Sequence, residues 1–266
     1  MENLNSLNII HIAGTKGKGS TCMFVGSFLI AHGNATGYPR KTGLYTSPHI
    51  RTVRERILIN NKPIPEELFA RRFFEIWDRL ATQSSESLDV PRYLQLLALM
   101  SFHVFIQEEV DVAICETHLG VEYDATNIVR NPVVTGITTI GMDHVKLLGP
   151  SIEDIAWHKA GIFKPGSLAF STFQETGVAA VLRHRAGEKE VTIKFVNIDS
   201  ALPSSAVVLK PRVQRINCSL ARVIVNAFLS KRAPEECSIL TSCDLSLGIE
   251  QFSWPGRFHQ IITGHY

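Results

Sequence analysis

Residues 8–21 read NIIHIAGTKGKGST, an apolar run of strand length that passes through a glycine-rich turn into a helix-prone segment. Glycines in such a turn let backbone N–H groups close around phosphate oxygens, and the helix N-terminus adds partial positive charge. Lys18 stands where its ammonium group can reach a terminal phosphate. The alternative is an ordinary flexible connection between strand and helix. The residues expected to contact phosphate are Gly14, Thr15, Gly17, Lys18, Gly19 and Ser20.

This turn departs from the common phosphate-loop pattern GxxxxGK[ST]. Ile12 stands where the first glycine of that pattern belongs, and Gly19 rather than a hydroxyl residue follows Lys18. A generic kinase or GTPase is therefore disfavoured.

Strand-length apolar runs alternate with longer segments along most of the chain, which is the rhythm of repeated βαβ units. The run at 110–115 is almost entirely apolar, as expected for a strand covered on both faces. The sequence therefore predicts an α/β fold, with a mostly parallel sheet flanked by helices. Predicted strands are 8–13, 42–45, 110–115, 133–140 and 167–171, and predicted helices are 20–31, 65–80, 92–107, 152–160, 177–185 and 213–230.

Other segments show weaker patterns. Residues 33–41 and 82–89 are predicted to be loops because they are rich in Gly and Pro or in Ser and acidic residues. Between 188 and 211 the pattern reduces to two short β-prone pieces, 191–196 and 206–209, whose partners the sequence does not identify.

Composition excludes several classes of protein. The net charge of +2 arises from 27 basic and 25 acidic residues spread along the chain, so no basic stripe for nucleic acid is expected. Five cysteines without a CxxC pair indicate neither a disulfide framework nor a zinc site, and favour a reducing compartment. No apolar stretch is long enough to span a membrane, and residues 1–6 are too short and polar for a signal or mitochondrial transit peptide. We therefore expect a cytoplasmic protein, and we expect it to be a monomer.

Six motifs in order resemble one known family. The variant Gly-Thr-x-Gly-Lys-Gly-Ser at 14–20 is similar to the phosphate loop of the Mur ligase superfamily, and Gly-Ser after the lysine narrows the resemblance to its folylpolyglutamate synthase branch. The later motifs are SPHI…ERI at 47–57, the E-x-G-x-G-G-x-x-D-x-T-N-like segment at 116–127, the D-H…LG…IA…K-x-GI run at 143–162, Q-x-x-N at 214–217 and WPGR at 254–257.

The resemblance implies an ATP-dependent ligase. The family adds L-glutamate to the γ-carboxylate of a reduced folate through an acyl phosphate. Two anions must meet in this reaction, so the site needs Mg²⁺ and fixed cations. The resemblance also allows a monovalent cation, and it implies Lys18, His144 and Lys159 as catalytic residues. Alternatives are a ligase redirected to another carboxylic acid, or a paralogue that binds nucleotide without ligating.

The motif positions assign further roles. Ser47, Glu116 and His144 are the metal-facing candidates, and Glu116 also ends a buried strand at the expected ligand crevice of an open α/β sheet. Ser47 before proline has turn chemistry as its alternative, and His144 a loop hydrogen bond. Lys159 resembles the lysine that is carbamylated in this superfamily, the alternative being a solvated helix lysine. The nucleotide-side candidates are Asn217, near the adenine, and Arg257, on the phosphates.

Two departures from the family pattern matter for function. The family's second domain is expected just after WPGR, so we interpret 1–254 as an ATP-binding domain and 255–266 as a linker remnant. On that basis the 266-residue chain alone is expected to ligate glutamate slowly or not at all. Within 117–122, Val121 or Glu122 replaces a glycine beside Glu116, where bulk or negative charge is expected to disturb the metal turn.

Overall fold

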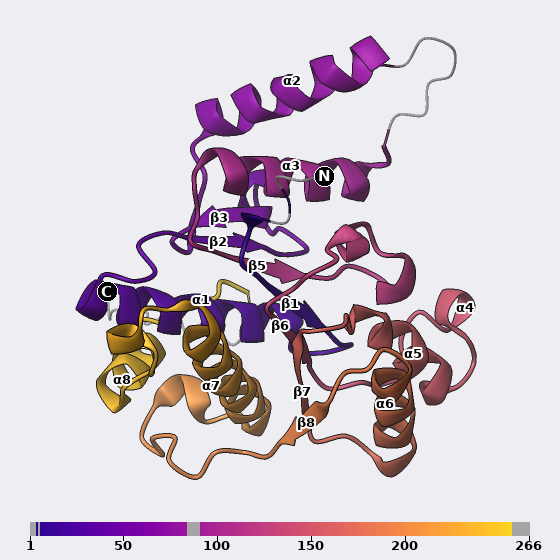
Figure 1. Cartoon of the computed structure of the whole chain (residues 1–266), viewed down its shortest axis with the longest axis vertical. Coiled ribbons are helices and arrows are strands. Elements are labelled where there is room, and N and C mark those ends of the chain that lie inside the picture. The colour runs from indigo at the N-terminus through magenta and orange to yellow at the C-terminus, as the bar shows by residue number, and fades with distance from the viewer. Residues whose placement is uncertain (1–3, 5, 84–90, 257–266) are drawn as a thin grey trace, which may run out of the picture.

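A central eight-stranded sheet organises the computed structural model, which describes residues 4, 6–83 and 91–256 (Figure 1). The strand order is β4-β3-β2-β5-β1-β6-β7-β8. The six strands from β2 to β8 in this order run parallel, whereas β3 and β4 are antiparallel additions at one edge. The predicted α/β class with a mostly parallel sheet is confirmed. The strands are β1 (Ile9–Ala13), β2 (Thr42–Tyr45), β3 (Ile57–Ile59), β4 (Lys62–Pro63), β5 (Val112–Glu116), β6 (Val134–Ile137), β7 (Leu168–Thr172) and β8 (Ile193–Val196).

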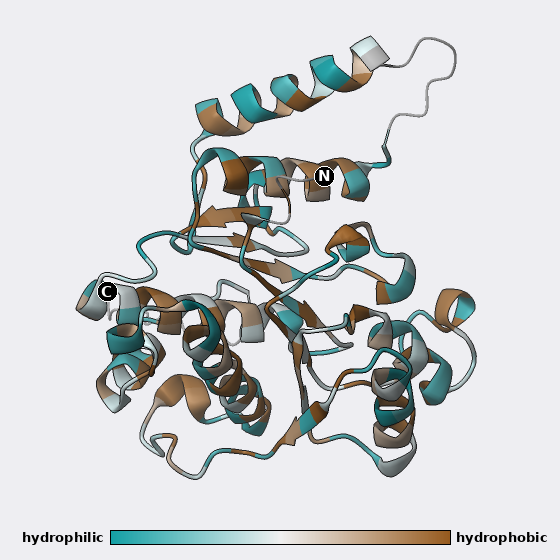
Figure 2. Ribbon diagram, in the orientation of Figure 1, coloured by the Kyte–Doolittle hydropathy of each residue, from teal (hydrophilic) through white to brown (hydrophobic). Residues whose placement is uncertain are grey.

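Helices cover both faces of the sheet and build separate cores. One core joins the sheet to α1, α7 and α8, a second joins it to α3, and a third joins β6 and β7 to α5 and α6. The amphipathic helix α2 packs outside α3, and its hydrophobic and hydrophilic residues alternate along the ribbon (Figure 2). The helices are α1 (Lys18–Thr36), α2 (Glu66–Gln83), α3 (Tyr93–Gln107), α4 (Val145–Leu148), α5 (Ile152–Lys159), α6 (Thr176–Glu188), α7 (Arg212–Arg232) and α8 (Ser242–Glu250).

The central strand β1 shows why the sheet is buried on both sides. Ile10 and Ile12 point into the core with α1 and α7, whereas Ile9 points into the core with α3. All five residues of β1 are buried. An uninterrupted apolar run therefore forms a strand here, because successive side chains enter cores on opposite faces.

Three local predictions need correction or completion. The β-prone piece 206–209 was wrongly assigned: it forms the 3₁₀ turn η6 (Val207–Leu209), because Leu209 is held in the core beside α7, away from a strand edge. The loop prediction for 33–41 is wrong at its start, since α1 continues to Thr36 and ends at Gly37, whose φ is 85°. For residues 191–196 the sequence identified no pairing strand. They contain β8, which pairs with β7.

Short elements escaped the sequence prediction. The β3–β4 hairpin turns at Asn60 and Asn61, both with positive φ (48° and 58°), a conformation that asparagine tolerates in tight hairpins. Of the loop predicted at 82–89, residues 82–83 end α2, and the rest lies outside the described residues. Across the described ranges no helix combines the length and apolarity needed to cross a membrane.

Candidate nucleotide site

The loop between β1 and α1 leaves the start of the helix open to a ligand. Gly17 occupies the N-cap position with φ of 92°, and no side chain caps the helix. The first backbone N–H groups of α1 have no acceptor within the helix, because the ladder begins with the bond from Thr21 N to Gly17 O at 2.9 Å. Exposed N–H groups and the positive end of the helix dipole together favour an anion such as phosphate.

Two glycines of the loop are required by space as well as by backbone conformation. A Cβ at Gly14, where φ is 140°, would lie 1.9 Å from Thr138 Oγ1. A Cβ at Gly17 would lie 2.3 Å from Asn217 Oδ1. The loop is therefore a tightly packed cradle, and Asn217, predicted on the nucleotide side, is buried directly against it.

Hydrogen bonds tie the loop to the segment that follows β6. Thr139 O accepts from Thr15 N at 3.0 Å and from Lys16 N at 3.1 Å. Thr15 Oγ1 also donates to Gly141 O at 3.1 Å. Because β1 and β6 are parallel, the segment that carries His144, three residues beyond Gly141, leaves the sheet at the same carboxyl edge as the loop.

His144 itself is available to a ligand. It precedes α4 with a positive φ of 49°, and its side chain is 50% exposed. Its Nε2 lies 3.4 Å from Asp143 Oδ2. A loop histidine whose only described polar neighbour is an exposed carboxylate keeps capacity to bind another group.

Glu116 lies at the carboxyl end of β5, facing the loop. It is 3% exposed, and its Oε1 lies 4.0 Å from Lys18 Nζ. The Thr46 hydroxyl and the Ser47 backbone N–H, the latter at 3.1 Å, both donate to Glu116 Oε2. Burial raises the pKa of Glu116, and the Lys18 charge acts against that rise. The site therefore holds a buried carboxylate beside the phosphate-loop lysine.

Lys159 approaches the loop from α5. Its Nζ donates to Gly14 O at 2.8 Å, and the side chain is only 3% exposed. Burial, reinforced by the Lys18 charge, lowers the pKa of Lys159 to about 8. The alternative of a solvated helix lysine is therefore wrong.

Known proteins resemble this chain over nearly its whole length. A folylpolyglutamate synthase from Neurospora crassa is 48% identical over 265 residues, covering 96% of this chain and 50% of the relative. A mitochondrial folylpolyglutamate synthase from Homo sapiens is 39% identical, covering 99% of this chain and 48% of the relative. No family model matches the chain. The chain is similar to about half of each of these synthases.

Solved folylpolyglutamate synthase structures share the fold. The apo form of the L. casei folylpolyglutamate synthase superposes with a TM-score of 0.84 at 27% identity, covering 98% of this chain and 67% of that one. A folylpolyglutamate synthase complex with AMPPCP and folate gives a TM-score of 0.83 at 27% identity, covering 96% of this chain and 66% of that one. The chain thus spans about half the length of the curated synthases it matches.

The turn that departs from the folylpolyglutamate synthase motif is well ordered by its own contacts. Asp124 Oδ2 accepts from the backbone N–H of His118 at 2.9 Å, and a 2.7 Å hydrogen bond joins His118 Nε2 to the Tyr45 hydroxyl. Val121 is buried in the core with α5 and α6, and Glu122 accepts from Arg185 Nη2 at 2.9 Å. Both replacement side chains therefore have partners on the α5–α6 side of the turn.

The metal-facing set expected of a folylpolyglutamate synthase stays a prediction. Of Ser47, Glu116 and His144, only Glu116 and His144 carry a carboxylate or an imidazole group. In the portion of the chain that the structure describes, no group of three or more His, Cys, Asp or Glu side chains is arranged to hold a metal. Arg257, expected on the phosphates, lies outside the described residues.

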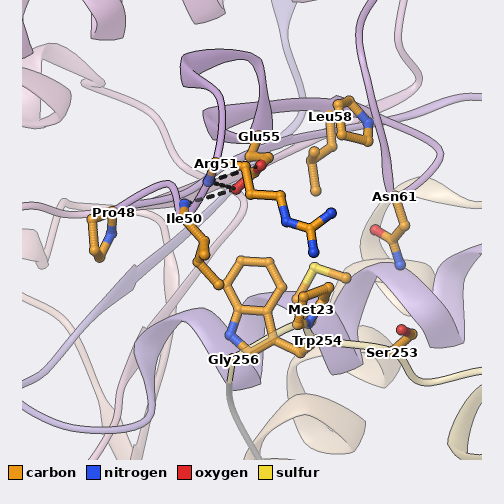
Figure 3. A pocket seen from close by; sticks show the side chains of 12 residues that line it. Met23, Pro48, Ile50, Arg51, Glu55, Leu58, Asn61, Ser253, Trp254 and Gly256 are labelled. Atoms are coloured by element: carbon orange, nitrogen blue, oxygen red, sulfur yellow. Dashed lines mark hydrogen bonds between the residues drawn. The ribbon is translucent and has the colours of Figure 1, made fainter. Parts of the chain in front are cut away.

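A cavity of about 700 Å³ opens beside the loop, between α1, the 48–63 segment and residues 253–256 (Figure 3). Its walls are mostly apolar, and the Arg51 side chain extends between Trp254 and Leu58. Trp254 also packs over the loop, since a Cβ at Gly19 would lie 3.2 Å from its ring. The cavity is lined by Met23, Pro48, Ile50, Arg51, Glu55, Leu58, Asn61, Pro63, Ser253, Trp254, Pro255 and Gly256.

Sequence reasoning missed two residues of this site. Thr46 was overlooked in favour of Ser47, although the parallel pairing of Tyr45 with Cys115 places the residue that follows β2 beside Glu116. Trp254 was quoted only as part of WPGR, and nothing in the sequence signals that its ring covers Gly19. Strand register was the usable signal in the first case, and the second depends on a tertiary contact.

Proposed function

We propose that this chain supplies the nucleotide-binding part of an ATP-dependent ligase of the folylpolyglutamate synthase type. Its substrates are ATP, L-glutamate and a reduced folate, whose γ-carboxylate is activated as an acyl phosphate. The observation that carries the proposal is the uncapped glycine cradle with Lys18 Nζ 4.0 Å from the buried Glu116 carboxylate. A ligase acting on another carboxylic acid, and a nucleotide-binding protein without ligase activity, are the competing hypotheses.

The glycine loop supports the proposal of ATP, and Mg²⁺ is proposed from the motif positions of three residues. Loop N–H groups and Lys18 bind the phosphates, and Glu116, with Ser47 and His144, is the set that would hold Mg²⁺, which would offset phosphate charge. A carboxylate oxygen of the acid attacks the terminal phosphorus and ADP leaves. The glutamate amine then displaces phosphate from the acyl carbon and gives up its proton. Lys18 contributes by neutralising the two anions that must approach each other.

We place the protein in the cytoplasm as a monomer with small-molecule partners. Some relatives point elsewhere: the human and Cricetulus griseus synthases carry mitochondrial in their names. Fractionation of cells that express the tagged chain decides the compartment, and light scattering decides the oligomeric state.

Glutamate ligation tests the proposal directly. The chain is joined to the remaining half of the Neurospora crassa relative and supplied with MgATP, a reduced folate and labelled glutamate. We expect label in the folate product, and we expect Glu116→Gln, which keeps the shape but removes the charge, to lower the rate by about a hundredfold or more. The same variant should lose the Mg²⁺-dependent tightening of ATP binding seen by calorimetry.

The outcomes separate the competing hypotheses. ATP binding without any ligation would support the nucleotide-binding protein without ligase activity. Ligation to a different carboxylic acid, with folate inert, would support redirected specificity. Unchanged Mg²⁺ dependence in Glu116→Gln would assign Glu116 a structural role.

Lys159 is expected to be carbamylated in a pH-dependent way. Only the neutral amine attacks CO₂, forming a carbamate and releasing a proton. With the pKa of Lys159 lowered to about 8, the neutral fraction is substantial at pH 8 and grows as pH rises through that value, whereas an exposed lysine stays charged. A carbamate signal in ¹³C NMR with labelled bicarbonate should therefore rise between about pH 7 and 9.

A matched lysine controls this experiment. With the α-amino group acetylated, because its ordinary pKa also lies near 8, Lys159→Ala should abolish the signal, while Lys146→Ala, on the neighbouring helix α4, should leave it intact. A signal that survives Lys159→Ala, or that does not change with pH, would contradict the assignment.

A further inference from the structure

Arg56 is a buried guanidinium with an unused donor. It ends the 3₁₀ turn η2 (Val53–Arg56) and is 7% exposed. Its Nε donates to His49 Nδ1 at 2.9 Å, but its buried Nη1 has no hydrogen-bond partner. Among the described residues, the arginine ion pairs within 4.0 Å involve Arg40, Arg72, Arg185 and Arg222, and none involves Arg56.

The neighbours of Arg56 offer no negative charge. The Tyr93 ring lies 5.7 Å from the guanidinium carbon. Burial raises the pKa of Tyr45, and the Arg56 charge acts against that rise, so the Tyr45 hydroxyl stays protonated beside it. The adjacent Glu55 carboxylate is committed elsewhere, because it accepts from the backbone N–H groups of 50–52 at 2.7 to 3.2 Å.

A buried arginine without a counterion is costly, because arginine keeps its charge at all ordinary pH values. The same chain shows the usual solution at Arg185, which is 8% exposed and pairs with Glu122 at 2.9 Å and Glu188 at 2.7 Å. Arg56 is equally buried and lacks such partners. An anion that arrives with a ligand would supply the missing charge.

Hydrogen bonds through Thr46 connect the backbone of Arg56 to the nucleotide site. Arg56 O accepts from Thr46 N at 3.0 Å, at the carboxyl end of β2. The Thr46 hydroxyl in turn donates to Glu116, the carboxylate beside Lys18. One residue therefore separates the backbone of Arg56 from the buried acid of the phosphate site.

We propose that Arg56 is the counter-cation for a carboxylate on the glutamate tail of the acceptor. Nη1 donates to a carboxylate oxygen, His49 fixes the guanidinium through Nε, and the half-exposed Tyr93 ring covers it. This inference rests on the proposed ligase function and identifies the anchor of its acid substrate. It explains why a buried charge without a carboxylate partner is kept at the residue whose backbone bonds to Thr46.

Calorimetry with two ligands tests the role of charge. The purified chain is titrated with folic acid and with the uncharged α,γ-diamide of folic acid. We expect Arg56→Gln to weaken folic acid binding about ten- to a hundredfold, since a buried charged hydrogen bond is lost, and to leave diamide binding unchanged. Arg56→Lys should recover part of the loss, because it restores charge without the planar fork.

Arg54→Gln is the matched control. Arg54 lies on the same turn and its Nη1 donates to Ile64 O at 2.9 Å, so this variant removes an equal charge from a guanidinium that has a partner. It should leave the preference for folic acid over the diamide intact. The melting temperature of ligand-free Arg56→Gln should not fall, because the charge that it removes is unpaired.

Each other outcome overturns the assignment. The assignment is overturned if Arg56→Gln binds folic acid with the affinity of the wild type. It is also overturned if the variant loses equal affinity for folic acid and for the diamide, which would indicate a structural role. Absence of folic acid binding in the wild-type chain while MgATP binds would also reject Arg56 as an anchor. Failure of MgATP to bind instead rejects the proposed ligase function, and the two failures are thus distinguishable.

Discussion

Replacing Lys18 by alanine is expected to weaken MgATP binding about ten- to a hundredfold. Lys18 is the first residue of α1, and its side chain is largely sheltered from solvent. Its ammonium group lies near the uncapped start of the helix, where phosphate is expected to bind. Charge-assisted hydrogen bonds to a phosphate contribute roughly 1.5–3 kcal/mol, which corresponds to that range of dissociation constants. Titration calorimetry on wild-type and variant protein measures the change.

Lys16→Ala provides the matched control for this result. Lys16 lies in the same loop, but its side chain is exposed, and its backbone N–H is already bonded to Thr139 O at 3.1 Å. Removing this charge should change ATP affinity by much less than removing Lys18, particularly at physiological salt. Equal losses in the two variants would reduce the role of Lys18 to a general electrostatic one, and equal affinity of Lys18→Ala and wild type would remove the phosphate-loop assignment.

The parallel sheet was predictable because burial on two faces leaves a clear mark in the sequence. The run at 110–115 has almost no polar residue, and β5 (Val112–Glu116) is buried throughout. The β3–β4 hairpin was not predictable by the same reasoning, since its strands have three and two residues. Runs that short carry no periodicity, and only the pairing with β2 makes them strands.

Some properties of the candidate site were likewise predictable from the sequence, and others were not. The glycine turn and Lys18 are contiguous in sequence, so their geometry follows from local rules for strand, turn and helix. The burial of Lys159 depends on the docking of α5 against Gly14, and the unpaired state of Arg56 depends on which acids the fold places elsewhere. Such properties arise from long-range packing, and a motif that names the residue does not specify its electrostatic environment.

Replacing Gly14 by alanine is expected to destabilise the fold by about 2–5 kcal/mol. Two costs add at this position: a φ of 140°, which side chains rarely adopt, and a Cβ placed 1.9 Å from Thr138 Oγ1 and 3.0 Å from Thr138 N. The hydroxyl can rotate away, but the backbone nitrogen of Thr138 is fixed by its bond to Ala13 O at 2.8 Å. Urea unfolding followed by circular dichroism measures the loss.

Two further variants separate the costs. Gly37→Ala also meets a positive φ, here 85°, but has no atom within 4 Å of the new Cβ, so it reports backbone strain without a steric contact, expected at about 1–2 kcal/mol. Combining Gly14→Ala with Thr138→Ala removes the closest contact, and should recover part of the lost stability while the strain remains. A loss in Gly14→Ala no larger than that in Gly37→Ala would mean that the loop can move away from Thr138. In that case the packing that holds the phosphate cradle in shape would be looser than the contacts between the loop and β6 indicate.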